Sequence, residues 1–169
     1  MKNLPDAEVL FEQLAEKIKP LITSETALVG IHSGGAWLME RLLPLLSPHG
    51  KELANGILDV SFYRDDYNQR GLHTETRPSQ IPFEVEGRHI ILIDDVFYTG
   101  RTIRAAMNEL FDYGRPASIS LAVLVNRGGR ELPITPQISA YDTTLTQSQN
   151  LQLLRHADGH FYLTLEENS

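Results

Sequence analysis

Two carboxylates and a hydroxyl-rich turn lie close together in the middle of the chain. Asp94 and Asp95 follow an apolar run at residues 90–93, and a turn at residues 99–102 comes shortly after them. Such a run predicts a strand covered on both faces, and the loop after it opens at the carboxyl edge of the sheet, where α/β folds bind ligands. The turn offers backbone N–H groups, two hydroxyls and a helix N-terminus, which suit an anion. These groups fit a ligand with vicinal hydroxyls beside a phosphate, such as a ribose 5-phosphate; the alternative is a core strand whose last Asp caps the next helix.

A second turn of the phosphate-binding type follows an earlier apolar run, at residues 27–32. It consists of Ser33, Gly34 and Gly35. Glycines at such a turn let the backbone approach an oxyanion closely and adopt unusual dihedral angles. On its own, such a turn more often indicates a tight strand-to-helix connection that binds nothing, and its position after the first core strand favours the binding role.

Helices and strands alternate along the chain, and this alternation predicts how the two turns are positioned. Strands are predicted at residues 27–32, 57–63, 90–95 and 119–125, helices at 36–46 and from about 100 to a C-cap at Gly114, and a loop at 96–99 between the third strand and the second of these helices. An earlier helix is predicted after an N-cap at Asp6. Its expected apolar face consists of Val9, Leu10, Leu14, Ile18 and Leu21. The order of elements predicts an α/β fold with a mainly parallel, doubly wound sheet.

Two further segments extend this core. Apolar residues alternate on both sides of Asp158-Gly159, which is a strong signal for an antiparallel hairpin. These residues are Leu151, Leu153, Phe161, Leu163 and Leu165. The polar segment at residues 64–80 is predicted to be a long loop, and loops of that length in compact domains are often active-site lids.

The composition limits the class of protein. A chain of 169 residues with 41% hydrophobic and 22% charged residues is expected to form one globular domain over residues 1–169. It has no cysteine, so disulfides and thiolate metal sites are excluded, and no apolar run reaches the length of a membrane span. A cytoplasmic protein with no membrane partner is therefore expected. The net charge of −7 argues against broad, nonspecific attraction to nucleic acid.

The segment around the two acids resembles the phosphoribosyl pyrophosphate (PRPP) signature of the type I phosphoribosyltransferases. Three longer segments are similar to the PyrR family in particular: SFYRDDYNQRGLH (61–73), DDVFYTGRTIRAAMNELFDYGRPASISLAVLV (94–125) and NRGGRELPI (126–134). PyrR proteins are pyrimidine-operon attenuators that also act as uracil phosphoribosyltransferases. The resemblance extends over roughly residues 27–134. It implies the type I phosphoribosyltransferase fold, with a mainly parallel central sheet flanked by helices and a C-terminal antiparallel hairpin or hood.

The resemblance also implies a role for each candidate residue. Asp94 and Asp95 would be the catalytic pair that holds the ribose 2- and 3-hydroxyls, and they would contact a metal mostly indirectly, through these hydroxyls or water. The residues expected to bind PRPP at its 5-phosphate are Val96, Phe97, Tyr98, Thr99, Gly100, Arg101 and Thr102. Those expected to bind pyrophosphate are Ser33, Gly34, Gly35 and Arg64, and those expected to bind the base are Asn126 and Arg127.

The chemistry of PRPP implies a cofactor and a set of partners. Transfer at the anomeric carbon develops positive charge on the sugar and releases pyrophosphate, so Mg²⁺ is expected to accompany PRPP. The resemblance implies a uracil phosphoribosyltransferase that makes UMP and pyrophosphate from uracil and PRPP. It also implies a pyrimidine-operon mRNA leader as a further partner, and assembly into a homodimer or larger homo-oligomer.

Three departures from the relatives keep other functions open. The turn Ser33-Gly34-Gly35 lacks the Arg or Lys that many relatives carry there, and Asn126 stands where relatives usually have Asp. The first helix has Glu12 and Glu16, whereas regulatory relatives carry basic or His residues on it. The acidic helix favours an enzyme over an RNA-binding attenuator. The alternatives are an attenuator or nucleotide sensor with weak catalysis, and a transferase for another base such as hypoxanthine.

Overall fold

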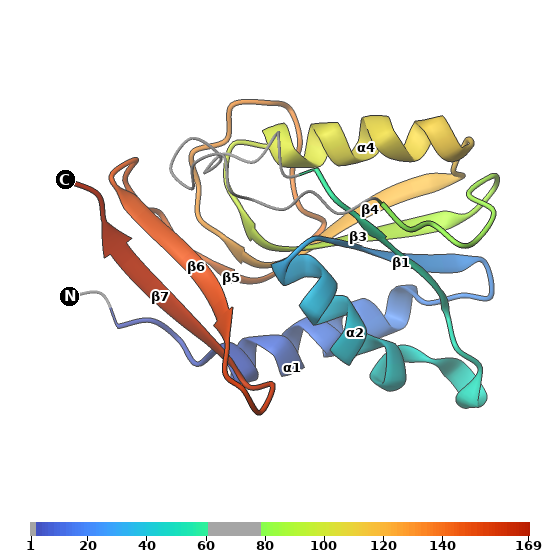
Figure 1. Cartoon of the computed structure of the whole chain (residues 1–169), viewed down its shortest axis with the longest axis horizontal. Helices are drawn as coiled ribbons and strands as arrows, with labels where there is room; N and C mark the ends of the chain where they lie inside the picture. Colours follow the sequence, from blue (N-terminus) through green and yellow to red (C-terminus); the bar gives the residue numbers. More distant parts are fainter. Residues whose placement is uncertain (1–2, 61–78) are drawn as a thin grey trace.

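The centre of the structure is a parallel β-sheet (Figure 1). The computed structural model describes residues 3–60 and 79–169. Within these residues the sheet has five strands in the order β2-β1-β3-β4-β5, and all neighbours pair in parallel. The strands are β1 (Thr26–Ile31), β2 (Ala54–Leu58), β3 (His89–Phe97), β4 (Ser118–Asn126) and β5 (Ile138–Asp142). The helices are α1 (Ala7–Ile18), α2 (Gly34–Leu46) and α4 (Arg101–Tyr113), with short 3-10 turns at Lys19–Leu21 and Pro48–Gly50.

Helices cover both faces of this sheet. Figure 1 shows α1 and α2 on one face and α4 on the other. Side chains alternate along β3, so Ile91 and Ile93 pack into the cluster that contains α1 and α2, whereas Ile90 and Leu92 pack with α4. A strand covered on both faces is what its continuous apolar run predicts. In the part of the chain that the structure describes, no helix is both long and apolar enough to cross a membrane.

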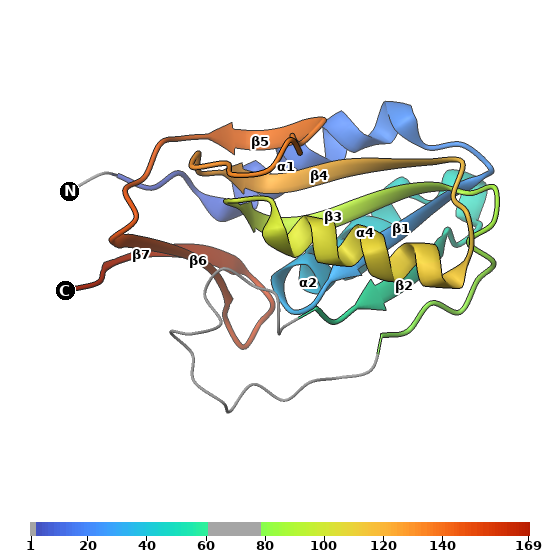
Figure 2. The same ribbon diagram turned by 90° about the horizontal axis from the view of Figure 1, so that it is seen from above.

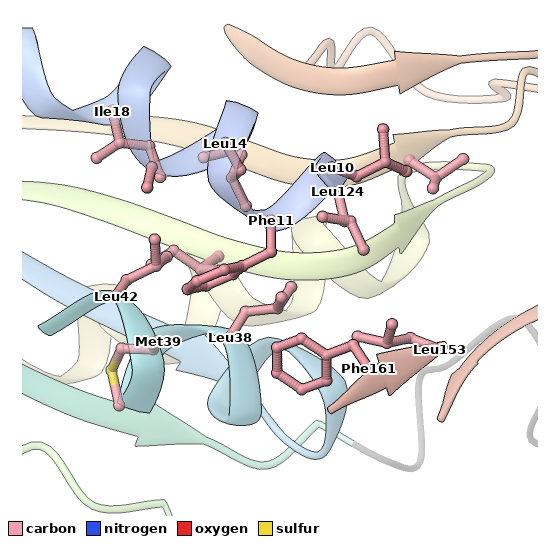
Figure 3. Close-up of a cluster of buried hydrophobic side chains, with 14 of the residues drawn as sticks. Leu10, Phe11, Leu14, Ile18, Leu38, Met39, Leu42, Leu124, Leu153 and Phe161 are labelled. Atoms are coloured by element: carbon pink, nitrogen blue, oxygen red, sulfur yellow. The ribbon is translucent and has the colours of Figure 1, made fainter. Parts of the chain in front are cut away.

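An antiparallel hairpin lies beside the carboxyl ends of the central strands (Figures 1 and 2). It consists of β6 (Gln149–Arg155) and β7 (Phe161–Glu167). Leu151 pairs with Leu165 and Leu153 with Leu163, as the alternation predicts. Leu153 and Phe161 are buried in the same cluster as the apolar faces of α1 and α2 (Figure 3). The hairpin is thereby held at the edge of the sheet where α/β folds bind ligands.

A polar contact, the Glu8–Arg41 junction, also ties the hairpin to the two helices. Arg41 in α2 donates hydrogen bonds of 2.7 and 2.8 Å to the two carboxylate oxygens of Glu8 in α1. The backbone N–H of Phe161 in β7 donates to the same carboxylate at 3.0 Å. The Arg41 guanidinium lies over the rings of Phe11 and Phe161, 4.3 and 4.5 Å from their centroids. The hydrogen bond from Arg41, followed by that from Phe161, holds the pKa of the Glu8 carboxyl below its usual value.

The first helix confirms its predicted cap but not all of its predicted face. The Asp6 side chain accepts a hydrogen bond of 2.8 Å from the backbone N–H of Glu8, as expected for an N-cap. Val9 and Leu21, which the sequence analysis places on the apolar face, are 47% and 44% exposed, so that part of the prediction is wrong. The residues of α1 that are buried are Ala7, Leu10, Phe11, Leu14, Ala15 and Ile18. Phe11 takes up the space between α1, α2 and the hairpin, and Val9 points away from it.

The largest differences from the predicted strands concern β2, β3 and β5. β2 begins at Ala54 and ends at Leu58 rather than covering residues 57–63, because the N–H of Asp59 donates to the Ser79 hydroxyl at 3.0 Å instead of continuing the ladder. Residues 61–63 lie outside the described part of the chain, and so does nearly all of the loop predicted at 64–80. β3 continues to Phe97, so Val96 and Phe97 belong to the strand rather than to the loop predicted at 96–99. β5 has no counterpart in the sequence analysis.

Candidate active site

The two acids lie near the carboxyl end of β3, the middle strand of the sheet. They are almost fully buried, with Asp94 2% and Asp95 8% exposed. Asp95 lies on the α2 side of the strand, because its carboxylate stands directly against Gly34 in the first turn of α2. The N–H of Asp95 donates to the Asp94 carboxylate at 2.9 Å, and the N–H of Val96 donates to that of Asp95 at 2.8 Å. The strand end therefore holds two buried carboxylates, and that of Asp95 lies directly against α2.

The turn after β3 leads directly into the N-terminus of α4. Gly100 is the N-cap and has a φ of 98°, a left-handed value that favours glycine. The Thr99 hydroxyl oxygen accepts a hydrogen bond of 3.2 Å from the N–H of Arg101. Thr99 and Thr102 are 5% and 8% exposed. The first N–H groups of a helix point out of its N-terminus, so this turn combines them with two hydroxyls at one place, as an anion site requires.

The side chains of Phe97, Tyr98 and Arg101, all expected at the 5-phosphate, have other contacts, and the Tyr98 ring lies against the Arg127 guanidinium. Phe97 is 2% exposed and packs in the cluster beneath α4, so its side chain supports the turn from below. The Arg101 guanidinium donates to the Glu131 carboxylate at 3.0 and 3.1 Å, and both side chains are more than half exposed. The Arg101 side chain is therefore engaged in a surface ion pair with the loop that follows β4.

The glycine turn after β1 begins α2 and lies against the acids. Ser33 is the N-cap of α2, Gly34 and Gly35 are its first residues, and the peptide bond between His32 and Ser33 is cis. A Cβ at Gly34 would stand only 2.6 Å from Cγ of Asp95, and one at Gly35 would clash with the backbone of Ile93. Both glycines are thus required by the close approach of α2 to β3, in addition to any approach to an oxyanion. The N-terminus of α2 therefore lies directly against the Asp95 carboxylate.

The residues expected to bind the base lie at the end of the neighbouring strand. Asn126 is the last residue of β4 and is in register with Phe97 of β3. The next residue, Arg127, is 5% exposed, and its guanidinium donates to the Thr146 carbonyl at 2.8 Å. The same guanidinium lies over the ring of Tyr98, 3.9 Å from its centroid. The base side and the 5-phosphate turn are therefore in direct contact.

Sequence reasoning named both Tyr98 and Arg127 but missed the contact between them. It also missed Thr146, which lies in the loop between β5 and β6, where no motif marks it. Glu131 belongs to the RELPI segment of the resemblance, but only the folded chain pairs it with Arg101. Arg64, expected on the pyrophosphate side, lies outside the described residues.

The donor set fits Mg²⁺ that arrives with a phosphorylated ligand. Within residues 3–60 and 79–169, no group of three or more acids, histidines or cysteines could hold a metal by itself. Asp94 and Asp95 supply hard oxygen donors, and Mg²⁺ is commonly held by one or two carboxylates together with substrate phosphates. Two helix N-termini, those of α2 and α4, flank these carboxylates. The arrangement can bind a sugar that carries two separate phosphate groups.

Comparisons with known proteins agree with this geometry. The chain matches the phosphoribosyl transferase domain family over residues 2–152. It is 47% identical over 155 residues to the bifunctional protein PyrR of Pseudomonas fluorescens, covering 89% of this chain and 90% of the relative. It is 46% identical over 150 residues to the bifunctional protein PyrR of Nitrosococcus oceani, covering 86% and 84%.

Solved structures with the same fold are more distant in sequence. One is the HGPRT-ase of Leishmania tarentolae in complex with GMP, with a TM-score of 0.64, 17% identity and coverage of 85% of this chain and 82% of that one. Another is the hypoxanthine phosphoribosyltransferase of Trypanosoma cruzi, with a TM-score of 0.63, 20% identity and coverage of 83% and 80%. At these identities the likeness concerns the fold, which is that of the type I phosphoribosyltransferases.

Proposed function

The chain belongs to the phosphoribosyl transferase family and, within it, to the PyrR proteins, and from this premise we propose that it is a uracil phosphoribosyltransferase that makes UMP and pyrophosphate from uracil and PRPP. One observation carries the proposal. The carboxylates of Asp94 and Asp95 stand between two helix N-termini, each preceded by a turn suited to an anion. PRPP carries a phosphate and a pyrophosphate on either side of two ribose hydroxyls, so this arrangement matches its charges and its hydroxyls.

The reaction breaks the bond between the anomeric carbon and the pyrophosphate oxygen and forms a bond from that carbon to a uracil nitrogen, whose proton is released to the pyrophosphate or to solvent. Thr99, Thr102 and the N–H groups of α4 hold the 5-phosphate, and the carboxylates hold the ribose hydroxyls. Because Asp95 lies directly against Gly34, the groups that hold the ribose and the turn that faces the departing pyrophosphate are fixed relative to each other, which favours a single reactive geometry. When Mg²⁺ is bound with PRPP, it neutralises charge on the departing pyrophosphate.

The base side supports a flat, amide-like substrate. Asn126 and Arg127 stand at the end of β4, and the N–H of Gly128 donates to the Asn126 side-chain oxygen at 3.3 Å. This contact leaves the Asn126 amide NH₂ as a donor for a carbonyl of the base. Where relatives carry an Asp, an Asn donates as well as accepts, so it can pair with an acceptor that a carboxylate repels.

A direct assay tests the proposal. Purified protein is incubated with PRPP, Mg²⁺ and radiolabelled uracil, beside parallel reactions with hypoxanthine and orotate, and the Asp94→Asn/Asp95→Asn double variant serves as the control. We expect UMP to form in the uracil reaction alone and to be nearly absent with the double variant. Preferential conversion of hypoxanthine would make this chain a purine transferase, and no conversion of any base would leave it as a nucleotide-binding protein.

A second activity, regulation through RNA, is favoured by one finding: the relatives at 44–47% identity are named bifunctional. We propose that the protein also binds a pyrimidine-operon mRNA leader in a UMP-dependent way, and that this is the lesser of its two activities. The exposed face of α1 carries Glu12 and Glu16, and the Lys17 ammonium donates to the Ser139 carbonyl at 2.8 Å. This face therefore offers little positive charge to RNA phosphates. We also propose that the protein works in the cytoplasm and that it forms a homodimer or larger homo-oligomer. Sedimentation of the purified protein tests the oligomeric state.

A further inference from the structure

The turn that follows β3 and the loop that follows β4 are joined by a series of contacts. The backbone N–H of Arg127 donates to the Phe97 carbonyl at 3.1 Å. Further along, the Thr99 carbonyl accepts from the N–H groups of Glu131 and Leu132, at 2.9 and 3.2 Å. Tyr98 lies between these two backbone connections. The Tyr98 ring therefore provides a side-chain contact between the turn expected at the 5-phosphate and the loop expected at the base.

The Tyr98 ring has two neighbours from the loop after β4. One is the Arg127 guanidinium, 3.9 Å from the ring centroid. The other is the backbone of Gly129, where an added Cβ would stand 2.6 Å from the ring atom Cε2. Contacts of a guanidinium with an aromatic face are attractive, and more so where water is excluded; Arg127 is 5% exposed and Tyr98 is partly buried.

Arg127 is also fixed at its other end, since its guanidinium donates to the Thr146 carbonyl. A planar contact with an aromatic ring restricts the rotation of a guanidinium in addition to any hydrogen bond that it makes. The ring of Tyr98 is therefore placed to set the orientation of Arg127. The backbone of Gly129, in turn, can approach the ring so closely because this residue has no Cβ.

We propose that Tyr98 is a positioning residue, whose ring, seated against the backbone of Gly129, holds Arg127 in the orientation that binds the base. This inference rests on the proposed function, because it assumes that Arg127 serves the base. It predicts that damage to the ring contact weakens binding of uracil and UMP while binding of the ribose 5-phosphate part is retained.

Two neighbouring glycines offer a matched pair of variants. Gly128 and Gly129 have φ values of 76° and 87°, so alanine imposes a similar backbone strain at both positions. Near Gly128, however, the nearest atom to an added Cβ is the Thr143 carbonyl oxygen at 3.6 Å, an ordinary contact, whereas at Gly129 the Cβ would collide with the Tyr98 ring. The difference between Gly129→Ala and Gly128→Ala therefore measures displacement of the ring.

The experiment measures the KM for uracil and for PRPP, together with calorimetric binding of UMP and of ribose 5-phosphate. We expect the KM for uracil to be about 10-fold higher in Gly129→Ala than in Gly128→Ala, which corresponds to the loss of one cation–π contact of a buried guanidinium. The affinity for UMP should fall to a similar degree. The KM for PRPP and the affinity for ribose 5-phosphate should be alike in the two variants. Tyr98→Leu should reproduce the loss, and Tyr98→Phe, which keeps the ring, should restore most of it.

The outcomes separate this inference from the function on which it rests. A wild-type protein that neither converts uracil nor binds UMP overturns the proposed function and the inference with it. The positioning role alone is overturned if the wild type is active but the two glycine variants have the same KM for uracil. It is also overturned if Tyr98→Leu weakens the binding of ribose 5-phosphate as much as that of UMP. If Gly129→Ala does not fold, the comparison of Tyr98→Leu with Tyr98→Phe decides the question by the same measurements.

Discussion

At the scale of single residues, the two acids of β3 have different neighbours although they are adjacent in the chain. The Asp95 carboxylate stands against Gly34 at the start of α2 and accepts from the N–H of Val96, whereas the Asp94 carboxylate accepts from the N–H of Asp95. Their sequence position was enough to predict a site at the end of a strand, because consecutive residues at a parallel strand's carboxyl end reach the ligand-binding edge. The Tyr98–Arg127 contact was not predictable in the same way, since it joins two loops whose relative position depends on the register of β3 and β4.

We expect Asp94→Asn/Asp95→Asn to reduce kcat/KM for UMP formation by about 100-fold or more, the range found when a group that stabilises developing charge is removed. Asn has nearly the shape of Asp and can accept the same backbone N–H bonds, so the fold should persist. Steady-state kinetics give the first quantity, and circular dichroism with thermal unfolding gives the second. Wild-type rates in a normally folded double variant would place the reaction elsewhere.

Thr99→Ala and Thr102→Ala should each make the free energy of UMP binding less favourable by about 1.5–3 kcal/mol, because each removes a hydrogen bond to a charged phosphate. Calorimetry with UMP measures this loss. Thr102→Ser, which retains the hydroxyl, is the matched control and should recover most of the affinity. Unchanged UMP affinity in both alanine variants would show that the phosphate binds at another turn.

At the scale of elements, the Glu8–Arg41 junction makes the docking of the hairpin dependent on pH. The pKa of Glu8 is lowered in the folded protein, first by the hydrogen bond from Arg41. A lowered folded-state pKa contributes stability that is fully present above the unfolded value of 4.5 and is lost as the pH falls through the folded value. Acid should therefore loosen the hairpin from α1 and α2.

We expect Glu8→Gln to lower the free energy of unfolding at pH 7 by no more than about 1 kcal/mol, because the ion pair is partly exposed. The loss of stability between about pH 5 and pH 3 should be shallower in this variant than in the wild type, since one of the titrating groups is gone. Denaturant unfolding at several pH values measures both. Glu12→Gln is the control, because Glu12 is exposed on the same helix. If the stability of the wild type and of Glu8→Gln depended on pH in the same way, the Glu8–Arg41 junction would be excluded as a source of acid sensitivity.

The predicted elements differ in how much local sequence defined them. β3, β4 and the hairpin have long apolar runs or strict alternation, and all were predicted close to their observed positions. β5 (Ile138–Asp142) is short, and its residues are only partly buried or exposed, so its sequence has no such run. It is a strand because it pairs with β4, with Ala122 opposite Ile138. Whether a segment at the sheet edge forms a strand depends more on its tertiary contacts than on its local sequence pattern.

At the scale of the whole molecule, the net charge argues against strong binding of RNA. The net charge is −7, and Glu12 and Glu16 are exposed on α1. We expect the protein to bind a pyrimidine-leader RNA weakly, with affinity that falls steeply between about 50 and 200 mM salt, as phosphate contacts require. Titration of labelled RNA with and without UMP measures this. Tight, UMP-dependent binding at physiological salt would instead make regulation the main function.

The contact between Glu8 and Phe161 also has a consequence for the order of events on the ribosome. The two residues are 153 positions apart, so at about 5–20 residues per second, roughly 8 to 30 s of synthesis separate them. During this time α1 is already available, but Phe11 and the Glu8 carboxylate still lack the partner that β7 provides. The segments that contribute to the ligand site, up to the loop after β4, are synthesised earlier than β7. A nascent chain can therefore assemble the ligand-binding edge first, and the part of the α1 face around Phe11 stays uncovered until β7 emerges. Chaperones would contact this part of the helix in that interval.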